Sequence, residues 1–241
     1  MDVKLPTLDK LFIVQLPVSC IFVFLSPPLS HPACLLPQQW EEQLGFKSCA
    51  TQQPKDKLFK LLIKLHVMAR ESLHGTTALI TGASEGIGYS IAKSLAEQGA
   101  NIILVARNLE KLEAAYSKLS SFSGRHMYIS TDVGNPAQVA DVVRLAQEHY
   151  STIEVLVNNA GLGYLDFLDR IPTERIQASI HTNHLGPTLF YQSLIPLFRK
   201  QQSGTVIDIL SQVALEVFDQ NAVYGSTKAA HRYLSLSMER E

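Results

Sequence analysis

The feature that most constrains this chain is a short apolar run that leads into a glycine-rich turn and then a helical pattern. Residues 78–92 read A-L-I-T-G-A-S-E-G-I-G-Y-S-I-A, with Gly82, Gly86 and Gly88 after the apolar run. A strand, a glycine turn and a helix in this order suit a pyrophosphate, because backbone N–H groups approach the phosphates and the helix N-terminus faces the anion. A plain tight turn also uses glycines, so the stretch indicates a nucleotide site only if matching residues follow.

The rest of the chain from Thr76 onward alternates short apolar runs with helical patterns, which is typical of βαβ units around a parallel sheet. We predict strands at residues 77–81, 101–105, 126–131, 154–157 and 205–210. We predict helices at 86–98, after the caps Asn108 and Asn135, at 173–199, and from near Ala222 onward. The expected fold class is α/β, a Rossmann-type doubly wound parallel sheet.

The composition excludes several classes of protein. A net charge of −1 argues against nucleic-acid binding. All three cysteines (Cys20, Cys34 and Cys49) precede residue 50, without the spacing of a disulfide framework or a zinc site. We therefore expect no metal, a reducing compartment and a cytoplasmic location.

The first 70 residues do not resemble the rest, so we expect an N-terminal extension at 1–70 and a nucleotide-binding domain at 71–241. The apolar run Leu11–Leu25, interrupted by Gln15 and Pro17, fits a signal-peptide core, a membrane anchor or an unstructured extension. The alternative location is therefore membrane-associated through residues 11–25. Residues 55–66 form a basic amphipathic pattern, expected to dock on the neighbouring domain, or alternatively to lie on an anionic membrane.

The residues after the next predicted strands bear on the cofactor. Arg107 follows the second strand, where NAD-specific proteins place a carboxylate, so NADP is favoured and NAD remains an alternative. A solvated surface arginine is the plain alternative for Arg107. Asp132 suits an adenine amino group or a helix cap, and N-N-A-G at 158–161 suits a turn that admits a cofactor or an ordinary turn.

The reactive residues are expected near the C-terminus. Ser211 ends the fifth strand, and Tyr224 and Lys228, four apart, share one face of the last helix. A neighbouring ammonium favours the phenolate form of a tyrosine, so Tyr224 is expected to have a lowered pKa. Tyr224 then exchanges a proton with an alcohol or carbonyl, and Ser211 stabilises the reacting oxygen. An amphipathic helix with a solvated lysine is the alternative.

Together these residues resemble the short-chain dehydrogenase/reductase family over residues 75–241, with T-G-A-S-E-G-I-G at 81–88, Asp132, N-N-A-G, Ser211 and Y-G-S-T-K at 224–228 in the family's order. The resemblance implies an NAD(P)-dependent enzyme for a small carbonyl or alcohol, often a homo-oligomer, and Arg107 favours NADP(H) as its cofactor. It implies the catalytic residues Asn183, Ser211, Tyr224 and Lys228, with Ser211 and Tyr224 at the substrate and Asn183 supporting a water-linked proton relay. The implied cofactor residues are Gly82, Ser84, Gly86, Ile87, Gly88, Arg107, Asp132, Val133, Asn159, Ala160, Gly161, Tyr224 and Lys228.

One departure from the family pattern concerns the end of the chain, because the family continues beyond the Tyr/Lys helix with another strand and a substrate lid. We therefore expect a sheet truncated after its fifth strand, with one uncovered edge and a last helix that lacks support. A catalytically inactive nucleotide-binding protein or a gene fragment is the alternative function. An apolar substrate wall is suggested by Val213, Ala214, Leu215, Val217 and Phe218 with 163–165, and ordinary loop packing is the alternative.

Overall fold

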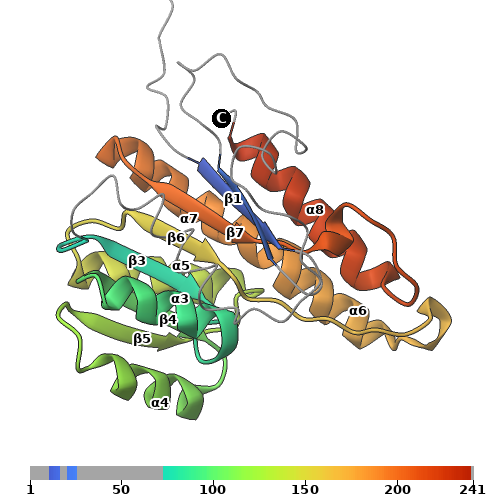
Figure 1. The fold of residues 1–241 in the computed structure, drawn as a ribbon, viewed down its shortest axis with the longest axis horizontal. Helices are drawn as coiled ribbons and strands as arrows, with labels where there is room; N and C mark the ends of the chain where they lie inside the picture. Colours follow the sequence, from blue (N-terminus) through green and yellow to red (C-terminus); the bar gives the residue numbers. More distant parts are fainter. Residues whose placement is uncertain (1–10, 17–20, 26–72, 240–241) are drawn as a thin grey trace, which may run out of the picture.

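A parallel sheet forms the centre of the computed structural model, which describes residues 11–16, 21–25 and 73–239. Helices cover both faces of the sheet (Figure 1). The five strands that residues 73–239 contribute run parallel in the order β7-β6-β3-β4-β5. They are β3 (Thr77–Thr81), β4 (Asn101–Ala106), β5 (His126–Ser130), β6 (Val155–Asn158) and β7 (Thr205–Ile209). The doubly wound fold is confirmed, and no end of a predicted strand is displaced by more than one residue.

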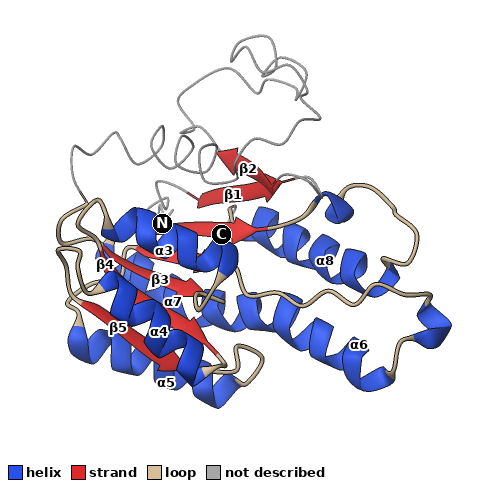
Figure 2. Cartoon of the chain, turned by 60° about the horizontal axis from the view of Figure 1, so that its bottom comes forward, coloured by secondary structure: helices blue, strands red, loops and turns tan. Residues whose placement is uncertain are grey.

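The helices also follow the predicted pattern. They are α3 (Gly86–Ala96), α4 (Leu109–Leu119), α5 (Pro136–His149), α6 (Thr173–Ile180), α7 (Gly186–Gln201) and α8 (Ala222–Met238), as Figure 2 shows. Both predicted caps are confirmed, because Asn108 accepts a bond from the Lys111 N–H at 2.9 Å and Asn135 accepts from the Ala137 N–H at 3.0 Å. The helix predicted at 173–199 is instead divided by a π-helical turn, His181–Leu185, between α6 and α7.

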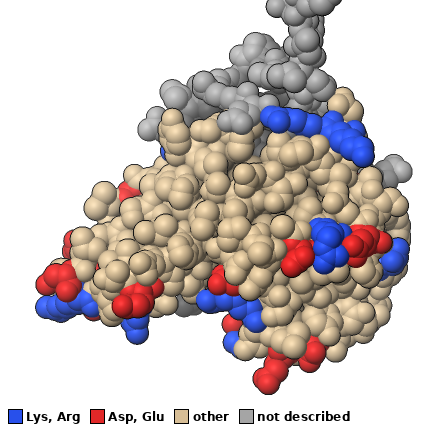
Figure 3. Space-filling model, turned by 180° about the vertical axis from the view of Figure 1, so that it is seen from behind, with Lys and Arg blue, Asp and Glu red and all other residues tan. Residues whose placement is uncertain are grey.

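The core has two layers, because successive side chains of the central strands point to opposite faces of the sheet. In β3, Ala78 and Ile80 face α3 and α4, whereas Leu79 faces α5 and α7. Strands that are buried on both faces read as continuous apolar runs, which explains the sequence of β3 and β4. On the face in Figure 3 most of the surface is uncharged, and acidic and basic side chains form small groups.

The edge of β7 differs from our expectation. Strand β1 (Leu11–Leu16) pairs in parallel with β7, from Leu11 beside Val206 to Val14 beside Ile209, and lies next to it in Figure 1. Strand β2 (Ile21–Leu25) pairs antiparallel with β1. The prediction of an uncovered strand edge is therefore wrong for β7, because β1 pairs with the backbone groups at that edge.

The membrane interpretation of residues 11–25 is not supported. The described backbone in this range is extended and belongs to the sheet, and its apolar residues include the β-branched and aromatic types that strands favour. Among residues 11–16, 21–25 and 73–239, no helix has the length and apolar character needed to cross a membrane. The amphipathic pattern at 55–66 and the three cysteines lie outside the described residues.

Candidate active site

The predicted site residues meet at one edge of the sheet, where the parallel strands end. Gly82 follows β3, Arg107 follows β4, Asn159 follows β6 and Ser211 lies two residues beyond β7. Open α/β sheets bind their ligands outside the carboxyl ends of the strands. The topology therefore brings together segments that lie far apart in the sequence.

The glycine turn has the geometry that its sequence predicts. Gly82 has φ +63° and Gly86 has φ +61°, the left-handed region that glycine adopts at little cost. A Cβ on Gly86 would meet nothing within 4 Å, so open space lies beside the turn. A Cβ on Gly88 would lie 2.4 Å from both the Gly82 carbonyl oxygen and the Asn159 Nδ2. The third glycine is therefore required for close packing of helix α3 against the turn.

Hydrogen bonds from the segment after β6 stabilise this turn. The Asn159 Nδ2 donates to the carbonyl oxygens of Thr81, at 2.9 Å, and Gly82, at 3.1 Å. The Thr81 hydroxyl accepts from the N–H groups of Asn159 and Ala160, each at 3.0 Å, and donates to the Val157 carbonyl at 3.2 Å. Asn159 and Ala160 thus shape the candidate nucleotide site, and Thr81 is a supporting residue that the sequence analysis did not single out.

The groups around the end of β4 carry positive charge toward the solvent. Arg107 is exposed, and Ser84 in the glycine turn is half-buried. The negative charge of Glu85 would repel a phosphate group bound at the glycine turn. Glu85 is paired with Lys111, however, and the Lys111 Nζ lies 2.9 Å and 3.0 Å from the two carboxylate oxygens. Ile87 is also exposed, at 37%. Because Lys111 offsets the carboxylate, Arg107 remains an available cation at this corner.

The turn after β5 holds Asp132 and Val133. The Asp132 side chain accepts from the Gly134 N–H at 3.0 Å, and its own N–H donates to the Gln138 side chain at 2.7 Å. Asn135, rather than Asp132, caps α5, so the helix-cap interpretation of Asp132 is wrong. Val133 is buried and lies against Gly186, at the start of α7.

Asn183 occupies the π-helical turn and is completely buried. Its Oδ1 accepts from the Leu162 N–H at 2.7 Å, and its Nδ2 donates to the Leu162 carbonyl at 2.7 Å and to the Thr227 hydroxyl at 2.9 Å. Thr227 in turn donates to the Tyr224 carbonyl at 2.8 Å. The π turn therefore places Asn183 where it connects the loop after β6 with the first turns of α8.

Tyr224 and Ser211 are brought together as predicted. Burial raises the pKa of Tyr224 above its ordinary value, and a hydrogen bond with Ser211 opposes that change. The expectation of a lowered pKa is therefore wrong for this structure, because desolvation of the phenol is the larger effect. A Cβ on Gly163 would lie 3.6 Å from the Tyr224 ring, so the loop after β6 passes the ring.

Lys228 is 3% exposed, and its Nζ donates to the Ile209 carbonyl at 2.8 Å. Burial lowers the pKa of Lys228 to about 8, and Asp208 acts in the opposite direction. A Cβ on Gly161 would lie 3.6 Å from both the Lys228 Nζ and the Asn183 Oδ1. The solvated-lysine alternative is therefore wrong, because the ammonium points to the end of β7.

The loop after β6 and the loop before α8 both carry apolar side chains. The Asp166 N–H donates to the Gln220 carbonyl at 3.1 Å, which joins the loop after β6 to the loop before α8. The apolar residues expected in a substrate wall include Val213, which is buried, and Val217, which is fully exposed. The other exposed apolar residues on these loops are Leu165, Phe167, Leu168, Leu215 and Phe218.

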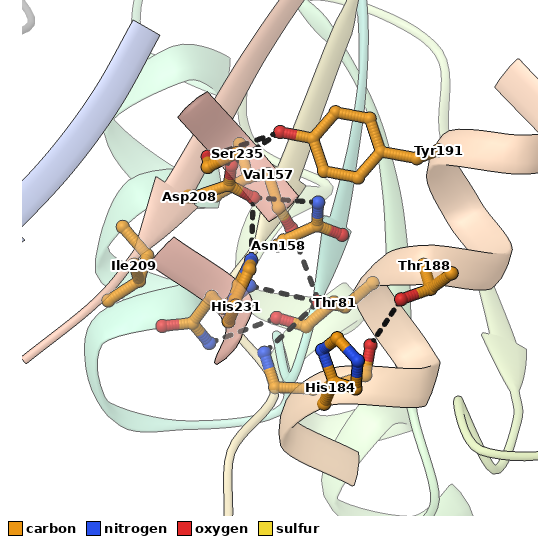
Figure 4. A network of polar contacts seen from close by, with 12 residues as sticks. Thr81, Val157, Asn158, His184, Thr188, Tyr191, Asp208, Ile209, His231 and Ser235 are labelled. Carbon is orange, nitrogen blue, oxygen red and sulfur yellow. Dashed lines mark hydrogen bonds and ion pairs between the residues drawn. The ribbon is translucent and has the colours of Figure 1, made fainter. Parts of the chain in front are cut away.

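A buried polar network behind the site was missed by the sequence analysis (Figure 4). Its centre is Asp208, which contacts Asn158, Tyr191, His231 and Ser235. The available signals were a carboxylate within an apolar strand, T-V-I-D-I, and polar residues three and seven positions after Lys228.

Comparisons with known proteins agree with this geometry. The family model for short chain dehydrogenase matches residues 76–241. An uncharacterized oxidoreductase of Staphylococcus epidermidis is 35% identical over 164 residues, which cover 68% of this chain and 70% of the relative. The solved structure of an alcohol dehydrogenase from the archaeon Thermococcus sibiricus, complexed with 5-hydroxy-NADP, has a TM-score of 0.66 and 30% identity, with 68% and 70% coverage. L-Sorbose reductase from Gluconobacter frateurii, complexed with NADPH and L-sorbose, has a TM-score of 0.66 and 31% identity, with 69% and 64% coverage.

Proposed function

Because this chain belongs to the short chain dehydrogenase family and is an NAD(P)-dependent oxidoreductase, we propose that it uses NADP(H) to interconvert a carbonyl and a secondary alcohol. One observation carries the proposal. Ser211 contacts Tyr224, Asn183 reaches the Tyr224 backbone through Thr227, and Lys228, one turn later on the same helix, is held at the end of β7. The glycine turn has open space next to Gly86. Residues that act on one oxygen atom must be close together, and the hydrogen bond between Ser211 and Tyr224 supports the proposal for these two residues.

The glycine turn fits a dinucleotide. Gly86 leaves a space that any side chain would enter, and the start of α3 has no side-chain cap on its backbone N–H groups. Unsatisfied N–H groups at a helix N-terminus bind anions, so these groups would hold the pyrophosphate. When bound, the cofactor supplies hydride to a carbonyl carbon or accepts it from an alcohol.

The preference for NADP rests on Arg107. A guanidinium matches the geometry of a phosphate group, and no carboxylate occupies the position after β4. Pairing of Glu85 with Lys111 removes the main electrostatic objection. Solved relatives that were crystallised with NADPH or 5-hydroxy-NADP agree with this preference.

Tyr224 is assigned the proton transfer. In reduction its hydroxyl donates a proton to the carbonyl oxygen as the carbonyl carbon is reduced, and in oxidation the phenolate takes the proton back. Lys228 stabilises the phenolate, and Ser211 donates a hydrogen bond to the reacting oxygen. Both polar groups of the Asn183 side chain are engaged with Leu162 and Thr227, so we assign Asn183 a positioning role, and its part in a water-linked relay stays a prediction.

The experiment is a turnover assay of the full chain. Reduction is measured as the loss of NADPH absorbance with a panel of apolar and polar ketones, and oxidation as the gain of NADPH absorbance from NADP⁺ with the matching alcohols. We expect Tyr224→Phe to abolish turnover while the Kd for NADPH stays within about twofold of the parent value. Tyr233→Phe is the matched control, because Tyr233 lies on the same helix and is 75% exposed. Undiminished turnover in Tyr224→Phe would overturn the assignment, and NADPH binding without turnover of any substrate by the parent chain would favour the inactive alternative.

Cofactor preference is tested by titration of NADPH and NADH into Arg107→Ala. A lost charge-assisted hydrogen bond costs about 1.5–3 kcal/mol, so the Kd for NADPH should rise roughly tenfold or more, with little change for NADH. Arg144→Ala is the matched control, since Arg144 pairs with Asp141 and Glu148 on the outer face of α5. Equal losses for both cofactors would remove the basis for NADP preference.

A further inference from the structure

Asp208 is a carboxylate at the centre of the buried network in Figure 4, on the strand that leads to Ser211. Its side chain is completely buried. It accepts hydrogen bonds from the Asn158 Nδ2, at 2.9 Å, and from the hydroxyls of Tyr191 and Ser235, and it lies 2.9 Å from the His231 Nε2. These partners come from β6, α7 and α8, so one carboxylate joins three elements to β7.

The partners on α8 lie on the same helix face as the candidate catalytic lysine. Lys228, His231 and Ser235 follow one another at spacings of three and four, which places them on one side of a helix. All three are buried against β7. The Lys228 Nζ donates to the carbonyl of Ile209, the residue next to Asp208. Within residues 73–239, the Lys228 ammonium forms no direct ion pair with a carboxylate.

The charges of this cluster follow from its contacts. Burial lowers the pKa of His231, and its Nδ1 has no hydrogen-bond partner among the described residues, so the ring is neutral and its Nε2–H donates to Asp208. Burial raises the pKa of Asp208, but the contact with His231 and the hydrogen bonds from Ser235 and Tyr191 outweigh burial and hold this pKa below its usual value, so the carboxylate is ionised. Burial and Asp208 raise the pKa of Tyr191, which stays neutral.

The other titratable groups that face this cluster are His184, on the π turn beside His231, and Tyr224, one turn before Lys228 on α8. Neither supplies a negative charge while Tyr224 is protonated. The cluster therefore holds one buried negative charge, on Asp208, and one buried positive charge, on Lys228. Opposite charges interact more strongly in a buried environment than in water, even when they are not in direct contact.

We propose that Asp208 is a positioning residue of the active site, whose carboxylate is the counter-charge that keeps the buried Lys228 protonated and whose bonds to His231 and Ser235 fix α8 against the strand that carries Ser211. The inference rests on the proposed role of Lys228. It adds the requirement that Lys228 be protonated, because only the charged ammonium can stabilise a phenolate at Tyr224.

The test is the pKa of Lys228, measured by NMR of protein labelled with ¹³C and ¹⁵N in lysine and assigned with Lys228→Met. We expect the pKa of Lys228 to fall by about one unit or more in Asp208→Asn, which keeps the shape of the side chain and removes its charge. Ser235→Ala is the matched control, since it removes a hydrogen bond to the same carboxylate without changing any charge. An unchanged Lys228 pKa in Asp208→Asn, or an equal fall in Ser235→Ala, would overturn the proposal.

A second variant keeps the test decisive if Asp208→Asn does not fold. In His231→Gln a neutral donor replaces the imidazole, so we expect the pKa of Lys228 to stay within about half a unit of the parent value. A clear rise would mean that His231 carried a charge that already neutralised Asp208, and the proposal would fail. The NMR measurement requires no turnover, so a chain without activity would refute the proposed function and still test this inference.

Discussion

Replacement of Gly88 by alanine tests the packing on which the candidate nucleotide site depends. The new Cβ would lie 2.4 Å from the Gly82 carbonyl oxygen and 2.4 Å from the Asn159 Nδ2. Ordinary contact begins near 3.4 Å, so α3 must move by about 1 Å from the Gly82 carbonyl, and Asn159 must also leave its place. Its departure would break its bonds to the carbonyls of Thr81 and Gly82.

Both responses have a similar cost. Overpacking costs about 1–3 kcal/mol, and two lost hydrogen bonds cost about 0.5–1.5 kcal/mol each. Alanine is favoured over glycine in a helix by up to about 1 kcal/mol, which offsets part of this loss. We therefore expect Gly88→Ala to lower the free energy of unfolding by about 1–3 kcal/mol and to weaken NADPH binding, because the turn and the helix N-terminus move apart.

Gly225→Ala is the matched control for this measurement. Gly225 also lies near the start of a helix, but its Cβ would meet the nearest atom, the Val213 carbonyl oxygen, at 3.4 Å. We expect its stability to be unchanged or to rise by up to about 1 kcal/mol. Urea unfolding followed by circular dichroism measures both variants. Equal stability of Gly88→Ala and Gly225→Ala would refute the close approach of α3 to the turn.

Three further predictions concern single side chains. Thr81→Val should lower stability by at least about 2 kcal/mol in urea unfolding, because the N–H groups of Asn159 and Ala160 lose their acceptor. Leu104→Ala should cost about 2–5 kcal/mol in the same assay, because the side chain is fully buried between α3 and α4. The stability of the parent relative to Lys228→Met should rise by about 3 kcal/mol between pH 8 and 10.5, because the folded state loses the Lys228 proton near pH 8 while the unfolded state keeps it. A flat difference across this pH range would contradict the burial of the ammonium.

The sequence predicts the central sheet well because its signals are local. Apolar runs, the caps Asn108 and Asn135, and the glycine turn each act within a few residues, and all three are confirmed. The meeting of Ser211 with Tyr224 was also predictable, because strand ends gather at one edge and residues of a helix repeat at known spacing. These parts required no knowledge of how distant segments pack.

The features that the sequence analysis missed depend on distant contacts. The pairing of β1 with β7 joins segments that lie far apart in the sequence, and the apolar pattern of residues 11–16 fits a strand, an anchor or a leader equally well. The π turn around Asn183 has no local signature, and it matters because the side chain reaches Leu162 and Thr227. The pairing of Lys111 with Glu85 was not expected, because Glu85 lies at the start of α3 and Lys111 at the start of α4.

Strand β7 explains why the reactive groups and the buried network belong together. Its side chains alternate, so Val206 and Asp208 face α7 and α8, while Ile207 and Ile209 face the opposite layer. Consecutive residues of one strand thus anchor α8 through a carboxylate and hold Lys228 through the Ile209 carbonyl, just before the chain reaches Ser211. Buried polar networks fix a unique arrangement when their members are satisfied. A polar inner face therefore gives α8 a defined register on β7, which a purely apolar face would specify less strictly, and that register sets the separation of Tyr224 from Ser211.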